Sequence, residues 1–179
     1  MTLSQSVQRG SLLAACALGW GLAAAPHVRI NTTPSMPLGL WGVVSPAYAM
    51  PRGTAVLACL PGKAAVLAAE RGYLVHGDCP GDVEVVLKRI AAVAGDVVTV
   101  SPAGITVNGV DLPGTAQRKH DSAGRDMPAV PAVTYTVEPG MVWLNTSQPR
   151  SYDSRYFGAV PLVSVHGRAF PIITGSETP

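Results

Sequence analysis

The stretch VEVVLKRIAAV (residues 83–93) places two charged residues, Lys88 and Arg89, in the middle of an apolar run. Its length and its content of Val, Leu and Ile predict a long strand. A lysine is rarely buried in a protein unless it has a partner or a function. Lys88 is therefore a candidate functional residue. The alternative is that it lies on the solvent face of an edge strand, where lysine hinders aggregation.

The segments on both sides of this strand are also predicted to be mainly β. The chain holds 19 Gly and 16 Pro among 179 residues, a composition that favours short strands joined by turns. Strands are predicted at residues 39–44, 53–60, 96–100, 105–107, 110–112, 134–137 and 141–144, with a strand pair at 162–173. A tight turn is predicted at Asn108-Gly109, a helix at 64–72, loops at 31–37 and 145–158, and an exposed loop at 114–131. The length fits a single domain.

An apolar segment precedes these strands. Residues 11–25 (SLLAACALGWGLAAA) carry no charge and follow Arg9, and with their neighbours they approach the roughly 20 residues that span a membrane. The positive residue before the segment predicts that the N terminus stays in the cytoplasm. We predict a cytoplasmic N terminus (1–9), a transmembrane anchor (10–28) and an exported domain (29–179). Because residues 23–25 resemble a cleavage site, a cleaved secretory signal is a second interpretation.

The amino-acid composition also indicates which kinds of molecule the protein contacts. Charged residues make up 13% of the chain, against about 25% in typical soluble domains, and the mean hydropathy is +0.27. These values predict that part of the chain contacts membrane lipid. The net charge is only +2 and Lys and Arg form no cluster, so nucleic acid is not an expected partner.

Two of the three cysteines, Cys59 and Cys79, lie in the body of the chain and next to turn signals. In an oxidising compartment they are expected to form a disulfide, the alternative being two unrelated buried thiols. The third, Cys16, lies in the apolar segment. The sequence has no CxxC motif and no His/Cys cluster, so we expect neither a metal nor another cofactor.

A second candidate is Ser35, in TPSMP (residues 33–37) shortly after the apolar segment. A serine hydroxyl attacks an amide only if a base takes its proton. The Lys88 amine can be that base if burial lowers its pKa toward neutrality. The histidines show no recognisable partners and are scattered, at His27, His76, His120 and His166. On its own, a serine in a Pro-bounded loop is also typical of a turn.

The third segment is SYDSRYFGAVP (residues 151–161). Its Asp153 and Arg155 are expected to form an ion pair that fixes the loop. Its first residue, Ser151, is expected to hydrogen-bond a lysine amine. We therefore expect this third segment to lie close to the segments that contain Ser35 and Lys88.

In this order the three segments resemble the signal peptidase I family. That family has a Ser-Met-Pro segment after a transmembrane helix, then a Lys-Arg segment ending in Gly-Asp, here KRIAAVAGD (88–96), then a Ser-x-Asp-Ser-Arg segment. The resemblance implies a signal peptidase-like β domain with small helices, in which Ser35 is the nucleophile and Lys88 the general base. It further implies that Ser151 orients the lysine and that Asp153 and Arg155 give structural support. Thr33 matches a hydroxyl that helps the Ser35 backbone N–H to hold the oxyanion.

Within the family, NTTPSMPLGLW (residues 31–41) resembles the TraF-type conjugative transfer peptidases, which mature pilin precursors. Of the Gly-Asp-Asn segment that housekeeping signal peptidases carry, only Asn145 is present. The resemblance implies an inner-membrane serine peptidase with its catalytic domain in the periplasm. Its substrate would be a pilin-like precursor with small residues at the cleavage site, and other conjugative transfer proteins are further candidate partners. In some members an amine of the pilin replaces water and gives a cyclic product, and the sequence leaves both outcomes open.

Three alternatives accompany this interpretation. A general signal peptidase acting on many secretory precursors is the nearest, and the missing Gly-Asp argues against it. A self-cleaving repressor of the LexA type needs a DNA-binding helix pair at its N terminus, where this chain has an apolar segment. A non-enzymatic scaffold of the transfer apparatus would not need Ser35 at all.

Overall fold

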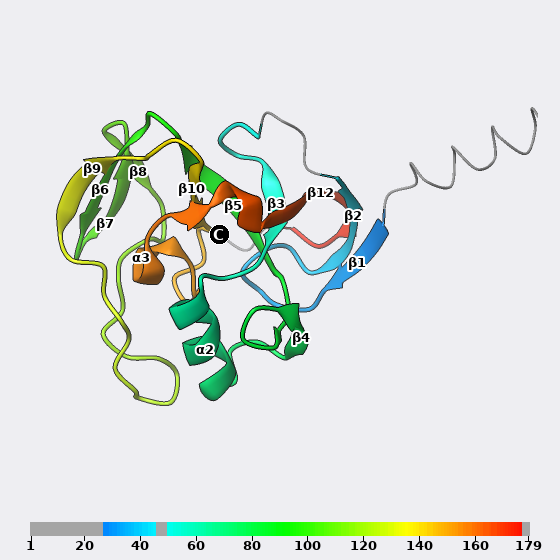
Figure 1. Cartoon of the computed structure of the whole chain (residues 1–179). Helices are drawn as coiled ribbons and strands as arrows, with labels where there is room; N and C mark the ends of the chain where they lie inside the picture. The colour runs from blue at the N-terminus through cyan, green and yellow to red at the C-terminus, as the bar shows by residue number, and fades with distance from the viewer. Residues whose placement is uncertain (1–26, 46–49, 177–179) are drawn as a thin grey trace, which may run out of the picture.

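Two antiparallel sheets form the body of the protein in the computed structural model, which describes residues 27–45 and 50–176 (Figure 1). The larger sheet has seven strands in the order β1-β2-β12-β3-β5-β10-β11. Their bounds are β1 (His27–Asn31), β2 (Gly39–Val44), β12 (Val165–Thr174), β3 (Ala55–Ala58), β5 (Val86–Val93), β10 (Met141–Asn145) and β11 (Val160–Pro161). The prediction of a mainly β fold is confirmed.

The smaller sheet has the order β8-β7-β6-β9, with bounds β8 (Val110–Leu112), β7 (Gly104–Val107), β6 (Val97–Ser101) and β9 (Val133–Thr136). The predicted turn joins β7 to β8, and both of its residues have positive φ, 51° at Asn108 and 77° at Gly109. Paired positive φ values are what a two-residue hairpin turn requires. Trp143 of β10 packs into the apolar core of this smaller sheet, so one strand joins the two sheets.

Helices are short in the described part of the chain. The predicted helix is present as α2 (Gly62–Glu70), two residues earlier than expected, and its buried side chains are the small Ala64, Ala65 and Ala68. Strand β4 (His76–Cys79) follows it. Two elements near the end of the chain are α3 (Ser154–Phe157) and the 3-10 helix η1 (Leu162–Ser164). In the described residues no helix has the length and apolar character to cross a membrane.

Several predicted elements differ from the observed ones. The loop predicted at 145–158 contains α3, which begins because the Asp153 side chain accepts a hydrogen bond from the Arg155 N–H. The strand pair predicted at 162–173 is wrong: after η1 a single strand, β12, pairs first with β3 and then with β2. Strand β1 was not predicted, and its start at His27 falls inside the segment expected to be an anchor. The rest of that segment, residues 10–26, lies outside the described residues.

The stretch at residues 83–93 contributes an interior strand of the larger sheet, β5, which begins at Val86. Strand β5 pairs with β3 on one side, where Lys88 faces Val56, and with β10 on the other. The Lys88 residue is only 4% exposed. The alternative that Lys88 lies on the solvent face of an edge strand is therefore wrong.

Candidate active site

Ser35 lies in the loop between β1 and β2, and Asn31 holds this loop in shape. The Asn31 Nδ2 group lies 2.9 Å from the Thr33 carbonyl oxygen, 2.9 Å from that of Met36 and 3.0 Å from that of Pro37. Its Oδ1 accepts a hydrogen bond from the Thr33 hydroxyl at 3.0 Å. The side-chain amide of Asn31 thus fixes the backbone on both sides of Ser35. Sequence reasoning missed Asn31, although it opens the predicted loop.

Lys88 is buried beside Ser151, as the resemblance implies. Its Nζ donates a hydrogen bond to the Ser151 Oγ at 2.7 Å. Burial of the amine lowers the pKa of Lys88 from 10.5 to about 8, against the opposing attraction of Asp153 and with a smaller contribution from the Arg155 charge. A substantial fraction of the amine is therefore neutral near physiological pH, as a general base requires.

Ser35 and Lys88 line the same cavity, together with Ser151. We call this space, of about 440 Å³, the Lys88 cavity. Two segments contribute to its lining, residues 29–33 at the end of β1 and residues 84–88 at the start of β5. The Thr33 hydroxyl lies 3.4 Å from the Ser35 Oγ. The structure thus brings together the serine, lysine and threonine that the sequence places far apart.

The loop at 114–131 also lines the Lys88 cavity, which was not expected of an exposed loop. Arg118, His120, Asp121 and Met127 all contribute to the lining. The loop is held to the end of α2 because the Tyr73 hydroxyl donates to the Asp121 carboxylate at 2.6 Å. This hydrogen bond and those from Arg125 hold the pKa of Asp121 well below its usual range. Only the tertiary contact makes this loop part of the site.

Asp153 and Arg155 form the expected ion pair, and both side chains are fully buried. The guanidinium binds the carboxylate through two hydrogen bonds, Nε to Oδ1 at 2.7 Å and Nη2 to Oδ2 at 2.9 Å. It also donates to the carbonyl oxygens of Gly114 at 2.6 Å and Thr146 at 2.9 Å. Asn145 donates to the Asp153 carboxylate at 2.9 Å, a role that the sequence did not reveal. The pair ties together the chain segments next to Ser151.

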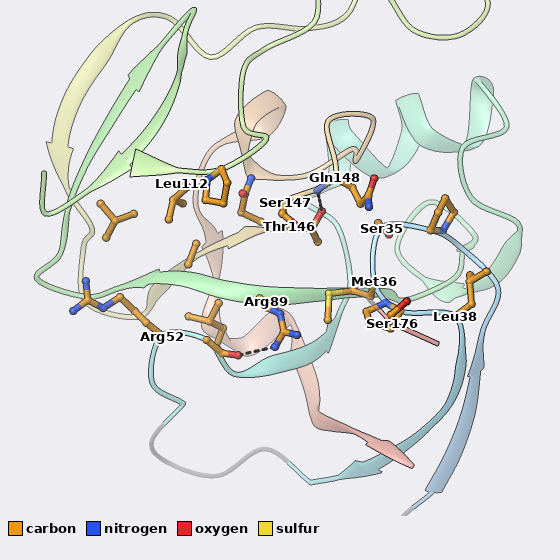
Figure 2. Close-up of a pocket in the computed structure, with 18 of the residues that line it drawn as sticks. Ser35, Met36, Leu38, Arg52, Arg89, Leu112, Thr146, Ser147, Gln148 and Ser176 are labelled. Atoms are coloured by element: carbon orange, nitrogen blue, oxygen red, sulfur yellow. Dashed lines mark hydrogen bonds between the residues drawn. The ribbon is translucent and has the colours of Figure 1, made fainter. Parts of the chain in front are cut away.

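A second cavity, of about 600 Å³, also borders the Ser35 loop (Figure 2). We call it the Arg52 cavity. Its lining shares Pro34, Ser35 and Gln148 with that of the Lys88 cavity. Ser35 therefore lies where two cavities meet, which is the arrangement needed by a group that attacks the middle of an extended chain.

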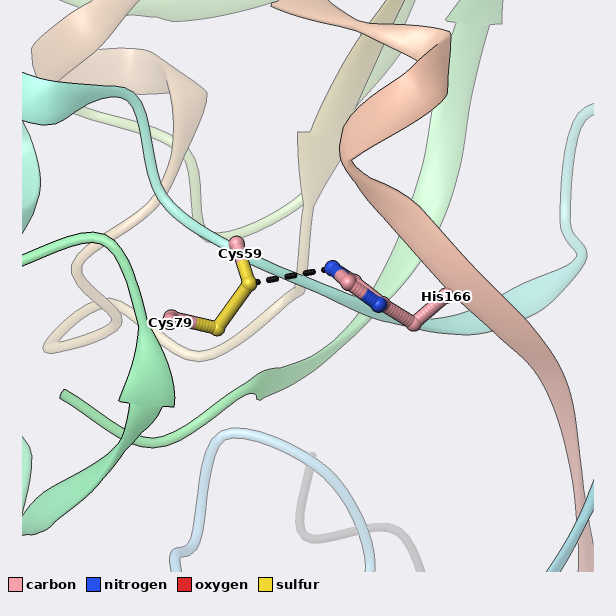
Figure 3. A group of neighbouring side chains, drawn as sticks. All are labelled: Cys59, Cys79 and His166. Carbon is pink, nitrogen blue, oxygen red and sulfur yellow. Dashed lines mark hydrogen bonds between the residues drawn. A yellow bond between two sulfur atoms is a disulfide. The ribbon is translucent and has the colours of Figure 1, made fainter. Parts of the chain in front are cut away.

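Cys59 and Cys79 are joined by a disulfide in the structure, with their Cα atoms 5.5 Å apart (Figure 3). His166, 107 residues away along the chain, places its Nε2 3.1 Å from the Cys59 Sγ. These three side chains would be a metal-ligand set only with free thiolates, because disulfide sulfurs are poor metal ligands. The disulfide joins the end of β3 to the end of β4, close to where the chain enters β5.

Replacing both Cys59 and Cys79 by Ser is expected to lower the free energy of unfolding by about 3 kcal/mol, because the unfolded chain gains the freedom of a 20-residue loop. Urea denaturation followed by circular dichroism measures the change. A reducing agent should lower the unfolding free energy of the wild type by a similar amount and leave that of the double variant unchanged. An unchanged wild-type midpoint on reduction would contradict the disulfide.

Several known proteins are similar to this chain in sequence over most of its length. Residues 7–174 match the family described as signal peptidase, peptidase S26. A plasmid transfer protein TraF of Escherichia coli is 36% identical over 86% of this chain and 87% of its own length. A probable conjugal transfer protein TraF of Sinorhizobium fredii is 39% identical over 82% of this chain and 77% of its own. Among solved structures, a signal peptidase I from Enterococcus faecalis covers 69% of this chain and 98% of its own, at 23% identity and a TM-score of 0.39. The chain belongs to the signal peptidase S26 family and is of the TraF type within it.

Proposed function

We propose that this protein is a membrane-anchored serine endopeptidase that processes an exported precursor, a conjugative pilin, with Ser35 as nucleophile and Lys88 as general base. The observation that carries the proposal is a buried lysine amine, with a pKa lowered to about 8, in a cavity that the candidate serine also lines. The TraF relatives are named for plasmid or conjugal transfer, which supports a substrate from a transfer apparatus. In this proposal the apolar segment that precedes β1, residues 10–26, holds the catalytic domain at the periplasmic face of the inner membrane.

The proposed reaction has two steps. The neutral Lys88 amine takes the proton of the Ser35 hydroxyl as its oxygen attacks the scissile carbonyl, and the lysine then gives that proton to the departing amine. This leaves an ester between Ser35 and the upstream part of the precursor. Water or an amine attacks the ester, loses a proton to Lys88 and releases the product, while the serine oxygen recovers a proton. Ser151, through its hydrogen bond, keeps the lysine amine oriented in both steps.

The substrate is expected to enter the Lys88 cavity as an extended strand. Residues 29–33 and 84–88 line this cavity, and an extended peptide can pair with the exposed main-chain groups of an edge strand such as β1. The apolar side chains of Trp41, Leu57 and Leu87 line the same cavity and would contact the small residues that the proposal expects next to the scissile bond.

Thr33 is proposed to stabilise the oxyanion together with the Ser35 backbone N–H. Its hydroxyl now donates to Asn31, so it would have to rotate about the Cβ–Oγ bond to donate to substrate. Replacing Thr33 by Val is expected to lower kcat about 100-fold or more, whereas Ser at this position retains the donor and most of the activity. Steady-state kinetics on a precursor peptide measure both. Equal activity of the Val and Ser variants would remove Thr33 from the mechanism.

The pH dependence follows from the lowered pKa of Lys88. The neutral amine is the active form, so its fraction rises with pH, from about a tenth at pH 7 to about nine tenths at pH 9. We expect kcat/KM to rise over the same range with a midpoint near pH 8. A rate that falls from mild acid to mild alkali would contradict a lysine base.

The proposal is tested by the intact mass of a candidate pilin precursor co-expressed with wild-type protein or with Ser35→Ala. Shortening of the precursor only with the wild type supports Ser35 as nucleophile. A product lighter by one further water identifies an amine as the second nucleophile and a cyclic product, whereas the linear mass identifies water. Equal processing with Ser35→Ala would refute the proposal and leave the scaffold alternative.

A general signal peptidase is the second candidate, since the matching family is that of signal peptidases. The cells that co-express the protein and the pilin precursor also distinguish the two functions. Processing of unrelated secretory precursors that depends on Ser35 favours the general enzyme, and processing limited to the pilin favours the transfer function.

A further inference from the structure

The proposed mechanism assigns no role to the Arg52 cavity, although Ser35 lies at its edge. In Figure 2 Ser35 is on one side of the cavity and Arg52 on the other, with Leu112 and Thr146 between them. Its volume of about 600 Å³ is within the range of sites that enclose small ligands. The cavity is thus large enough for a short stretch of peptide and continuous with the attacking hydroxyl.

The lining of this cavity is largely apolar and carries positive charge. Met36, Ile90, Val107, Leu112 and Pro113 supply apolar surface. Among the described residues of the lining, the charged side chains are those of two arginines, Arg52 and Arg89, and none is acidic. Such a surface fits a ligand with apolar side chains and a carboxylate.

Arg52 is placed to meet such a carboxylate. Its side chain is 51% exposed, and its Nη1 lies 3.7 Å from the Asp96 Oδ1, a long ion-pair distance. The Asp96 carboxylate already accepts hydrogen bonds from the Val93 N–H at 2.9 Å and from Asn108 at 2.8 Å. Asp96 therefore has other donors of its own, and the guanidinium of Arg52 keeps donors for a second anion.

The two cavities suit the two parts of a cleaved chain differently. The upstream part is bonded to Ser35 between the two steps, and the edge strand β1, whose residues line the Lys88 cavity, can hold it by main-chain pairing. The downstream part has to leave after the first step so that the second nucleophile can enter. The Arg52 cavity also borders Ser35, so it is the space that remains for this downstream segment.

We propose that the Arg52 cavity binds the downstream part of the substrate, with apolar residues next to the scissile bond and a carboxylate, from a side chain or a chain end, beside Arg52. This inference rests on the proposed peptidase function. It names a specificity-determining residue, Arg52, that lies outside the machinery of Ser35 and Lys88.

The test uses the full chain and peptides with one upstream sequence and a downstream segment ending in Glu, Gln or Lys at the same position. Wild type is expected to cleave the Glu peptide about three- to fivefold more efficiently, by kcat/KM, than the Gln peptide, the size of a solvent-exposed ion pair. Arg52→Gln should bring this ratio to about one. Arg168→Gln, an equal loss of charge at an exposed residue in neither cavity, should retain the wild-type ratio.

A second pair of variants tests the same cavity by adding charge. Val110 lines it and is 67% exposed, so a polar side chain there is tolerated by the fold. Val110→Lys is expected to raise the Glu-to-Gln ratio and Val110→Glu to lower it. The same ratio in wild type, Arg52→Gln and both Val110 variants would overturn the inference and leave the peptidase function intact.

If wild type cleaves none of the peptides, binding replaces cleavage as the measurement. The fluorescent Glu peptide is titrated into Ser35→Ala protein and into the same protein that also carries Arg52→Gln. Weaker binding on loss of Arg52, by a factor that shrinks at high salt, supports the inference. Binding that does not depend on Arg52 overturns it, whereas the failure of cleavage counts against the proposed function alone.

Discussion

Replacing Lys88 by Arg should abolish cleavage as completely as replacing it by Ala, although Arg retains the positive charge. A guanidinium stays protonated near neutrality, so it cannot take the proton of Ser35. The expected loss is at least about 100-fold in kcat/KM for either variant, since general base catalysis is worth about that or more. The measurement is cleavage of a precursor peptide, with thermal unfolding recorded for each variant.

A control separates lost chemistry from lost folding. Lys88→Met removes the amine and fills most of its volume in the same apolar surroundings, so this variant should fold and be inactive. Arg at this position adds bulk and a buried charge, so a lower Tm is expected for it than for Met. An active Arg variant would show that Lys88 is not the base.

The largest effect on stability is expected from the buried ion pair. Asp153→Ala leaves the fully buried Arg155 guanidinium without its carboxylate, which costs about 3–5 kcal/mol of unfolding free energy. Urea denaturation measures the loss. The matched control is Asp126→Ala, which removes a carboxylate that is 93% exposed and 3.2 Å from His120. Its effect should stay below about 1 kcal/mol.

A double replacement tests the reason for this difference. Asp153→Leu combined with Arg155→Met removes both charges, so no uncompensated charge is left in the interior. The double variant should therefore be more stable than Asp153→Ala alone. A double variant as unstable as the single one would show that the hydrogen bonds to Gly114 and Thr146, rather than the charge, hold the loop.

What the sequence predicted depended on local signals. Lys88 stood out because a charge within an apolar run is unusual, and Asp153 and Arg155 because they lie two apart in a distinctive segment. Asn31 gave no such signal, because its three carbonyl partners become close only when β1 and β2 pair and bend the loop back. The polarity of residues 114–131 predicted exposure. That loop nevertheless lines the Lys88 cavity through a hydrogen bond between Tyr73 and Asp121, 48 residues apart.

Strand β12 shows a different limit of local signals. The sequence predicted a strand pair where a single long strand lies, because its pairing with β3 through one half and β2 through the other depends on strands that are more than a hundred residues away. The proximity of His166 to the disulfide follows from the same pairing. Contacts of this range are set by topology, which the sequence indicated only through the family resemblance.

The placement of Lys88 on an interior strand of the larger sheet has a consequence for when the protein can be active. The apolar surroundings that lower the pKa of its amine exist only after β3 and β10 have joined β5 on either side. In an incompletely folded chain the same lysine is exposed to water and protonated at neutral pH. If Lys88 is the base, as proposed, a nascent chain is inactive until β3 and β10 have paired with β5. The peptidase then becomes active only on folding.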